Sequence, residues 1–166
     1  MSTLWSYFWP ALGAGIIVGM IAGLVGFRKR SLRNFSFAIG AIISIGLAAL
    51  WHGPLGGADR FSVEVERMVR ATLVYNEIPE VSGHLHRDPL TRRVMLSGPA
   101  DDFQRSELVR IMNDVPGVGS ASWSGDGGGV PLIAEGIITS AVGFLLGLVL
   151  AYLMDLRRRY NAQWKW

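Results

Sequence analysis

The chain has 166 residues, half of them hydrophobic, with a formal net charge of +3 and no cysteine. The lack of cysteine excludes disulfides, thiolate metal sites and a cysteine nucleophile. A mean hydropathy of +0.32 is high for a soluble domain, and the apolar residues cluster in three nearly uncharged runs at 7–27, 35–51 and 131–153. Each run is long enough to cross a hydrocarbon core of about 30 Å as a helix.

Residues 1–52 are expected to form a hairpin of two transmembrane helices, over about 7–27 and 35–51. Each helix has a stripe of small residues at a spacing of four, which places them on one helix face. The stripes are Ala11, Gly15, Gly19 and Gly23 in the first helix, and Ser36, Gly40, Ser44 and Ala48 in the second. Aromatic residues typical of the membrane interface precede the first helix: Trp5, Tyr7, Phe8 and Trp9.

Residues 53–129 are expected to form one small α+β domain of the order α-β-β-α-β, bounded by glycine-rich linkers. Apolar residues at helical spacing over 61–73 predict its first helix. Alternation of apolar and polar residues over 81–85 and 92–97 predicts two strands. A turn at Asp88-Pro89 joins these two strands in the prediction.

The second half of this domain predicts a helix followed by a last strand. Asp101, with Gln104 three residues later, has the spacing of a capping box at the start of a helix. Pro116 and Gly117 stop the helix, and residues 118–123 predict the strand. The apolar face of the helix is expected to comprise Phe103, Leu108, Ile111, Met112 and Val115.

The segment 94–118 consists of Val-Met-Leu-Ser-Gly at 94–98, then a predicted helix, then Val-Pro-Gly-Val at 115–118. This segment resembles the core of a BON domain. This module is named for bacterial osmotic-stress and nodulation proteins. In it, a strand ending in a Leu-x-Gly step is followed by a helix and by a Gly-Val step into the last strand. The resemblance covers about residues 61–123. It implies a non-catalytic module that attaches to phospholipid surfaces or to other envelope components.

Residues 130–166 are expected to hold the third transmembrane helix, over about 131–153, and a basic tail. The small-residue stripe of this helix comprises Thr139, Gly143, Gly147 and Ala151. Glu135 lies about one turn into the helix, and an ionisable residue in a membrane segment is a candidate functional site. A helix N-terminus favours negative charge, so we favour a structural role for Glu135. His52 is its nearest candidate partner by depth.

The basic residues are distributed unevenly. The first connection and the C-terminal tail hold eight basic residues and one acid, whereas the rest of the chain holds eight basic and twelve acidic residues. Cytoplasmic flanks of membrane helices carry the excess of Lys and Arg, so these two segments are expected in the cytoplasm, in contact with lipid headgroups. The residues are Arg28, Lys29, Arg30, Arg33, Arg157, Arg158, Arg159 and Lys165.

The high isoelectric point of the chain therefore reflects membrane topology, and no nucleic-acid partner is expected. The N-terminus and the central domain are expected on the opposite side. In a bacterium, this arrangement corresponds to the inner membrane, with the central domain in the periplasm.

The polar block has several residues that resemble parts of catalytic or metal-binding motifs. His84 and His86 project to one face of their strand, but a metal site needs a third or fourth ligand, and Asp88 is the sole further candidate. Asp101 and Asp102 are explained by helix capping. The glycine run at 125–129 lacks the Lys-Ser/Thr of a phosphate loop. We therefore expect no enzyme activity and no cofactor.

The three stripes of small residues predict close helix packing, because in lipid close van der Waals contact must hold helices together. One stripe per helix can be used inside a three-helix bundle, or against other membrane subunits or further copies of the chain. The leading hypothesis is a non-enzymatic membrane subunit or scaffold with an extracytoplasmic interaction domain. The alternatives are a small homo-oligomeric channel and an envelope tether that binds phospholipid.

Overall fold

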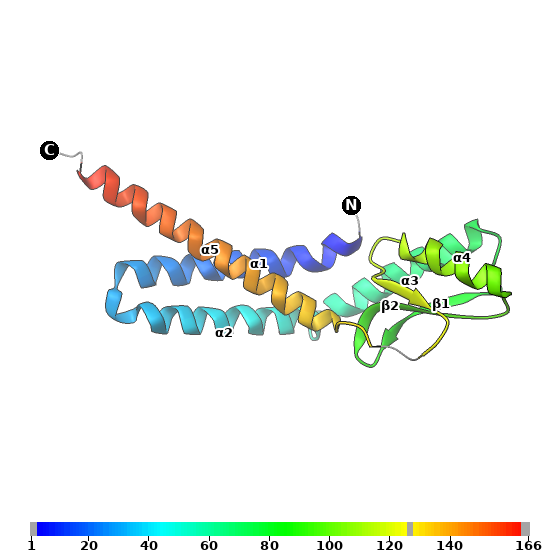
Figure 1. Ribbon diagram of the computed structural model, residues 1–166. Coiled ribbons are helices and arrows are strands. Elements are labelled where there is room, and N and C mark those ends of the chain that lie inside the picture. Colours follow the sequence, from blue (N-terminus) through cyan, green and yellow to red (C-terminus); the bar gives the residue numbers. More distant parts are fainter. Residues whose placement is uncertain (1–2, 126–127, 164–166) are drawn as a thin grey trace. The chain divides into compact units, whose positions relative to one another are not determined.

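The computed structural model describes residues 3–125 and 128–163, and the chain divides into two compact units (Figure 1). One unit comprises Phe8–Leu55 and the described residues from Gly136 onward. The other comprises the described residues up to Tyr7 together with Gly56–Glu135. Compared with the predicted 53–129, the central segment of the α+β unit begins three residues later, at Gly56, and the unit also includes the first turns of the first and the last helix.

Three helices have the length and composition of membrane spans, as predicted. They are α1 (Thr3–Arg28), α2 (Arg33–His52) and α5 (Leu132–Gln163), and a short 3-10 helix, η1 (Arg30–Leu32), connects the first two. The last helix continues ten residues past the predicted end at 153. Its extension is rich in good helix formers, and Arg159 Nε lies 2.7 Å from Asp155 Oδ2 one turn earlier.

The α+β unit has the predicted element order. Its elements are α3 (Gly57–Tyr75), β1 (Ser82–Arg87), β2 (Leu90–Ser97), α4 (Asp102–Asn113) and β3 (Ser120–Ser122). The sheet order is β1-β2-β3, with β1 antiparallel and β3 parallel to β2. The last strand is shorter than the predicted 118–123, because Val118 N–H donates to the carbonyl oxygen of Val115 in a turn.

One face of the sheet packs against α3 and α4. Leu85, Val94 and Leu96 on the strands are buried there with apolar residues of both helices. The approach is close at Gly83, where an added Cβ would lie 2.7 Å from Val69 Cγ1. The buried helix residues are Phe61, Val65, Val69, Leu73, Leu108 and Met112.

The start of α4 departs partly from the prediction. The capping box of Asp101 and Gln104 is confirmed, with both reciprocal hydrogen bonds present. Phe103, however, is 78% exposed, so its predicted place on the apolar face is wrong. The first turn of α4 extends past the buried core, and the helix becomes buried only at Leu108.

Tyr7 belongs to the core of the α+β unit. Its ring lies 5.6 Å from that of Phe61, and its hydroxyl donates to the carbonyl oxygen of Leu132 at 3.4 Å. Because Tyr7 is only 2% exposed, its predicted place at the membrane interface is wrong. The neighbouring Trp5 and Trp9 are about half exposed.

The opposite face of the sheet is crossed by the chain that follows β3. Arg93 is buried there and donates to Ser122 Oγ at 2.7 Å and to the carbonyl oxygen of Ser124 at 3.1 Å. Thr91 and Pro131 form an isolated bridge. The glycine-rich run predicted as a linker therefore has described parts that lie against the sheet.

Candidate functional site

The small-residue stripes of α1 and α5 lie in backbone-to-backbone contact. A Cβ added to Gly19 would lie 2.1 Å from the carbonyl oxygen of Phe144, and one added to Gly147 would lie 2.2 Å from that of Ile16. These distances leave no room for a side chain, so glycine is what permits the contact. The same close approach to backbone occurs at Gly15 and Gly143.

The stripe of α2 meets the other two helices at Gly40. An added Cβ there would lie 2.8 Å from Ala22 Cβ and 2.8 Å from the ring of Phe144. Further along α1, a Cβ added to Gly23 would lie 2.5 Å from Ala151 Cβ. All three stripes are thus used for packing inside the three-helix bundle.

Ser44 and Ser140 connect α2 to α5 through buried hydroxyl groups. Their Oγ atoms lie 2.8 Å apart, and both side chains are at most 1% exposed. The Ser140 hydroxyl is also 3.0 Å from the carbonyl oxygen of Ser44, to which it can donate. The sequence did not single out Ser140, because it lies one position away from the stripe of α5.

Replacing Ser44 or Ser140 with alanine is expected to cost about 0.6 kcal/mol of unfolding free energy, and at most about 1.7 kcal/mol, the range for hydrogen bonds inside membranes. The double variant is expected to lose less than the sum of the single losses, because the two hydroxyls share a hydrogen bond. Unfolding of the four proteins in mixed micelles, followed by circular dichroism, measures this coupling. Strictly additive losses would show that the hydroxyls do not interact.

Glu135 forms an ion pair with Arg92 of β2. The Nε atom of Arg92 lies 3.2 Å from Glu135 Oε2, and the two side chains are 26% and 24% exposed. The pair joins the first turn of α5 to the sheet, which agrees with a structural role for Glu135. The sequence did not distinguish Arg92 from its neighbour Arg93, whose side chain is buried on the other face of the sheet.

His84 and His86 lie on β1, on either side of the buried Leu85. His84 is exposed, and His86 Nδ1 lies 3.1 Å from the carbonyl oxygen of Pro89. Among residues 3–125 and 128–163, no group of three His, Cys, Asp or Glu side chains is placed to hold a metal ion. The two histidines therefore have no third ligand in that part of the chain.

Two exposed ion pairs lie on the helices of the α+β unit. A side-chain hydrogen bond from Arg67 lowers the pKa of Glu64, and one from Arg110 lowers the pKa of Glu107. Each pair is spaced three residues apart on a solvent-exposed helix surface, where such pairs stabilise a helix only slightly. These pairs support α3 and α4 locally and do not form a site.

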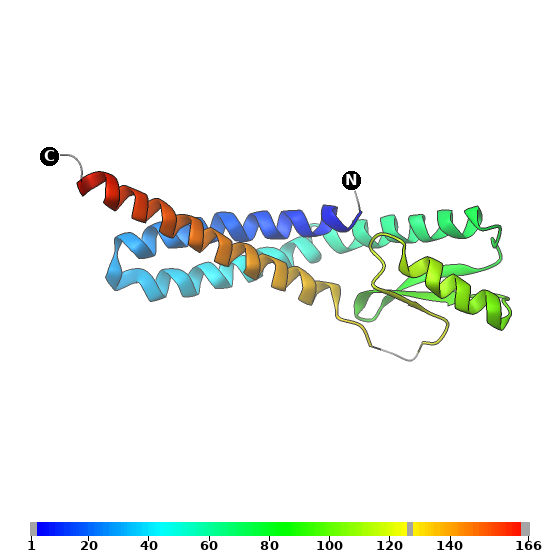
Figure 2. The ribbon, with the colours of Figure 1, turned by 45° about the horizontal axis from the view of Figure 1, so that its top comes forward.

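The last turn of α3 and the first turn of α4 lie at the same end of the α+β unit (Figures 1 and 2). Both turns expose large apolar side chains. Tyr75 is 87% exposed, Phe103 78% and Val74 60%. Two exposed prolines lie in the adjoining segments. We call the surface formed by Val74, Tyr75, Pro79, Pro99 and Phe103 the tip surface.

The two chain segments that carry the tip surface touch each other. A Cβ added to Gly98 would lie 2.7 Å from the carbonyl oxygen of Glu80 and 2.9 Å from Val81 Cα. Immediately beyond, Ser82 and Ser97 are paired in the sheet, with their hydroxyl oxygens 2.8 Å apart. These contacts hold the two segments together at this end of the α+β unit.

The tip surface has an acidic rim. Residues 74–81 and 98–104 include four acidic residues and no basic one, namely Glu77, Glu80, Asp101 and Asp102. Glu77 has a φ of 60°, a left-handed conformation that costs a residue other than glycine roughly 1–2 kcal/mol. The chain therefore has a glutamate at a position whose backbone conformation favours glycine.

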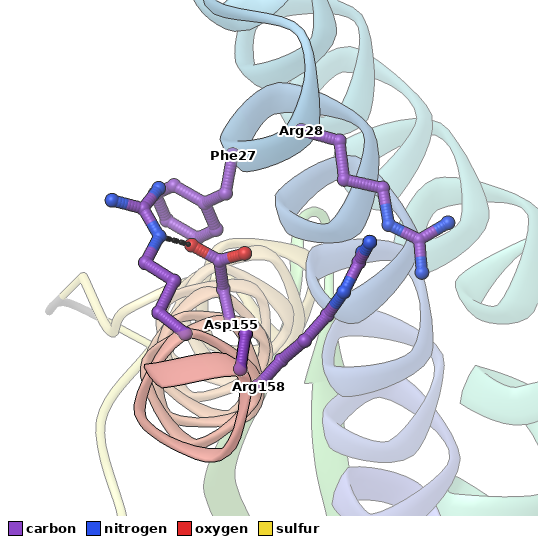
Figure 3. Close-up of a pocket in the computed structure, with 6 residues that line it drawn as sticks. Phe27, Arg28, Asp155 and Arg158 are labelled. Carbon is purple, nitrogen blue, oxygen red and sulfur yellow. Dashed lines mark ion pairs between the residues drawn. The ribbon is translucent and has the colours of Figure 1, made fainter. Parts of the chain in front are cut away.

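A second candidate site lies between the ends of α1 and α5, in a cleft of about 560 Å³ (Figure 3). We call it the basic cleft; it is lined by Phe27, Arg28, Asp155, Arg158, Arg159 and Ala162. Arg159 forms an ion pair with Asp155. Figure 3 shows Arg28 and Arg158 on the other side of Asp155, with their guanidinium groups turned toward the same region.

The structure separates the basic residues that the sequence grouped together. Arg28, Arg158 and Arg159 line the basic cleft. Lys29, Arg30 and Arg33 are exposed in the connection between α1 and α2 and at the start of α2, and Arg157 is exposed on α5. Trp164, Lys165 and Trp166 lie outside the described residues.

No protein-family model, curated protein or solved structure matches this chain. The resemblance to the BON domain therefore rests on the sequence pattern alone. The features that bear on function are the tip surface, the basic cleft and the packing of the helices.

Proposed function

We propose that this chain is a non-enzymatic membrane protein, a subunit or scaffold, whose three helices anchor a small α+β docking module. The tip surface is the proposed docking site for a partner protein. The exposure of Tyr75 and Phe103 at the same end of the α+β unit carries the proposal. Single exposed apolar residues are ordinary, but a contiguous apolar patch with a polar rim is typical of a protein interface.

The packing of the helices supports placing the partner at the tip surface. The small-residue stripes of α1 and α5 are filled by each other's backbone. The α2 stripe at Ser36 and Gly40 also borders a groove of about 410 Å³ between α1 and α2, whose other lining is mostly aliphatic. The outward side chains of α2 include Ile42, Ile45 and Leu50, between 45% and 69% exposed. Aliphatic side chains of this kind suit lipid, whereas a homo-oligomeric channel would need polar groups facing a pore.

The acidic rim indicates the chemistry of the partner. Four carboxylates repel the anionic surface of a membrane and attract Lys and Arg side chains. The proposed partner therefore presents a basic and apolar segment. We place the module on the side opposite the arginine-rich connection, following the charge distribution; in a bacterium this side is the periplasm.

The test uses the full chain in its native membranes, with a photo-reactive amino acid at position 75 or 103. Both positions are expected to cross-link to one protein through a peptide that contains Lys or Arg. Position 63 is the matched control, because Val63 is 65% exposed on the same helix as Tyr75 but about 18 Å away along it. No protein cross-link is expected there.

A charge reversal makes the test specific. Glu77→Lys combined with Glu80→Lys is expected to abolish cross-linking from position 75, because the partner would then meet like charge. Cross-linking that survives this reversal, that is equal at position 63, or that reaches only lipid would contradict the proposed docking site.

A further inference from the structure

The basic cleft contains more positive charge than its single acid can balance. Three guanidinium groups from two helices line it, together with the carboxylate of Asp155. Asp155 is paired with Arg159, with Nε 2.7 Å from Oδ2, and its side chain is 15% exposed. Within the described residues, Arg28 and Arg158 have no ion-pair partner. The cleft thus has two uncompensated cations, one on α1 and one on α5.

The position of the cleft along the helices corresponds to the level of lipid headgroups. The ring of Phe27 lies 5.6 Å from the rings of Phe37 and of Tyr152, so the three helices meet at this level. The apolar run of α1 ends one residue later at Arg28, and that of α5 ends at Met154, just before Asp155. The phosphates of a bilayer lie just outside its hydrocarbon core.

We propose that the basic cleft binds a phosphate group between Arg28 and Arg158. Guanidinium groups donate paired hydrogen bonds that match the geometry of phosphate oxygens, and basic pockets between helices are known sites for lipid head groups. The cleft volume of about 560 Å³ lies in the ordinary range for ligand sites, about 300–1,000 Å³. The phosphate belongs to a phospholipid or is free in solution, and the two sources are distinguished below.

Asp155 limits the strength of this site. Its carboxylate holds Arg159 in an ion pair and repels an anion in the same cleft. Removing its charge would leave three guanidinium groups facing the ligand. Asp155→Asn is therefore expected to strengthen phosphate binding, whereas loss of either unpaired arginine weakens it. A purely structural role for these residues would not produce effects of opposite sign.

The experiment uses the full chain in a neutral detergent. Phosphatidylglycerol, inorganic phosphate and phosphate-free dioleoylglycerol are titrated separately, and binding is read from the rise of the thermal unfolding midpoint. Arg28→Gln and Arg158→Gln are each expected to weaken binding about fivefold, and their combination about 25-fold, following the contribution of one arginine near a phosphate surface. Asp155→Asn is expected to strengthen it about fivefold by the same reasoning.

Arg157→Gln is the matched control, because it removes the same charge from the neighbouring position on α5 and is expected to change affinity less than twofold. Binding of phosphatidylglycerol alone assigns the site to lipid, and equal binding of inorganic phosphate assigns it to the free anion; either result supports the proposal. Three results overturn it: no binding of either probe, equal binding of dioleoylglycerol, or an equal loss in Arg157→Gln. These results are independent of cross-linking at the tip surface.

Discussion

Phe61→Ala is expected to lower the free energy of unfolding of the α+β unit by about 3–5 kcal/mol, the usual cost of truncating a buried phenylalanine. Phe61 is 1% exposed and packs against Tyr7. It also lies close to the turn before β3, where a Cβ added to Gly117 would lie 3.6 Å from its ring. The substitution therefore leaves a cavity where α3 meets the first turn of α1 and the turn that leads into the sheet.

Hydrogen exchange of the full chain in micelles, read by mass spectrometry over 82–97, measures this loss locally. Val63→Ala is the matched control, because Val63 lies on the same helix but is 65% exposed, and a change within about 0.5 kcal/mol is expected there. Equal exchange in the two variants would mean that Phe61 is not part of the core. For the same reason, the amide hydrogens of 82–97 are expected to exchange faster in a chain that lacks Tyr7 than in the full chain.

Gly19→Ala is expected to lower the free energy of unfolding of the bundle by about 1–3 kcal/mol, the usual cost of overpacking. The new methyl group would lie 2.1 Å from the carbonyl oxygen of Phe144. Because the obstacle is backbone, no side-chain rotation relieves the clash, and α1 and α5 must move apart. Unfolding in mixed micelles, followed by circular dichroism, measures the effect.

Gly13→Ala provides a control of opposite sign on the same helix. No atom of the described residues lies within 4 Å of a Cβ added to Gly13, so alanine is expected to be neutral or to stabilise the helix by up to about 1 kcal/mol through its higher helix propensity. Should both variants be equally stable, the close approach of α1 and α5 would be refuted. Gly46 on α2, which is open in the same way, offers a second such position.

Much of the fold could be predicted from the sequence because it depends on local patterns. Long uncharged runs have few alternatives to membrane helices, and the change from helical spacing to alternation marks the helices and strands of the α+β unit. The capping box at Asp101 is local as well, since both partners lie within four residues. Errors occurred where one element extends beyond its apolar pattern, as at the end of α5.

The candidate sites were predicted less completely. The sequence grouped Arg28 with Arg158 as topology signals and headgroup contacts, but nothing in a linear pattern shows that two residues 130 positions apart line one cleft. It placed Phe103 in the core, because helical spacing cannot show where a helix extends past the sheet. Tyr7 looked like an interface aromatic, although its ring is buried against Phe61.

By itself, the sequence determined which segments are helices, strands and apolar spans, since hydrophobic period and run length are properties of neighbouring residues. The tertiary structure alone decided which small-residue stripes meet, which aromatic residues remain exposed and which arginines lack an acid. These outcomes depend on contacts between distant segments, where a difference of one helical turn decides whether a side chain is buried. The docking surface and the phosphate site proposed here both arise from that second kind of information.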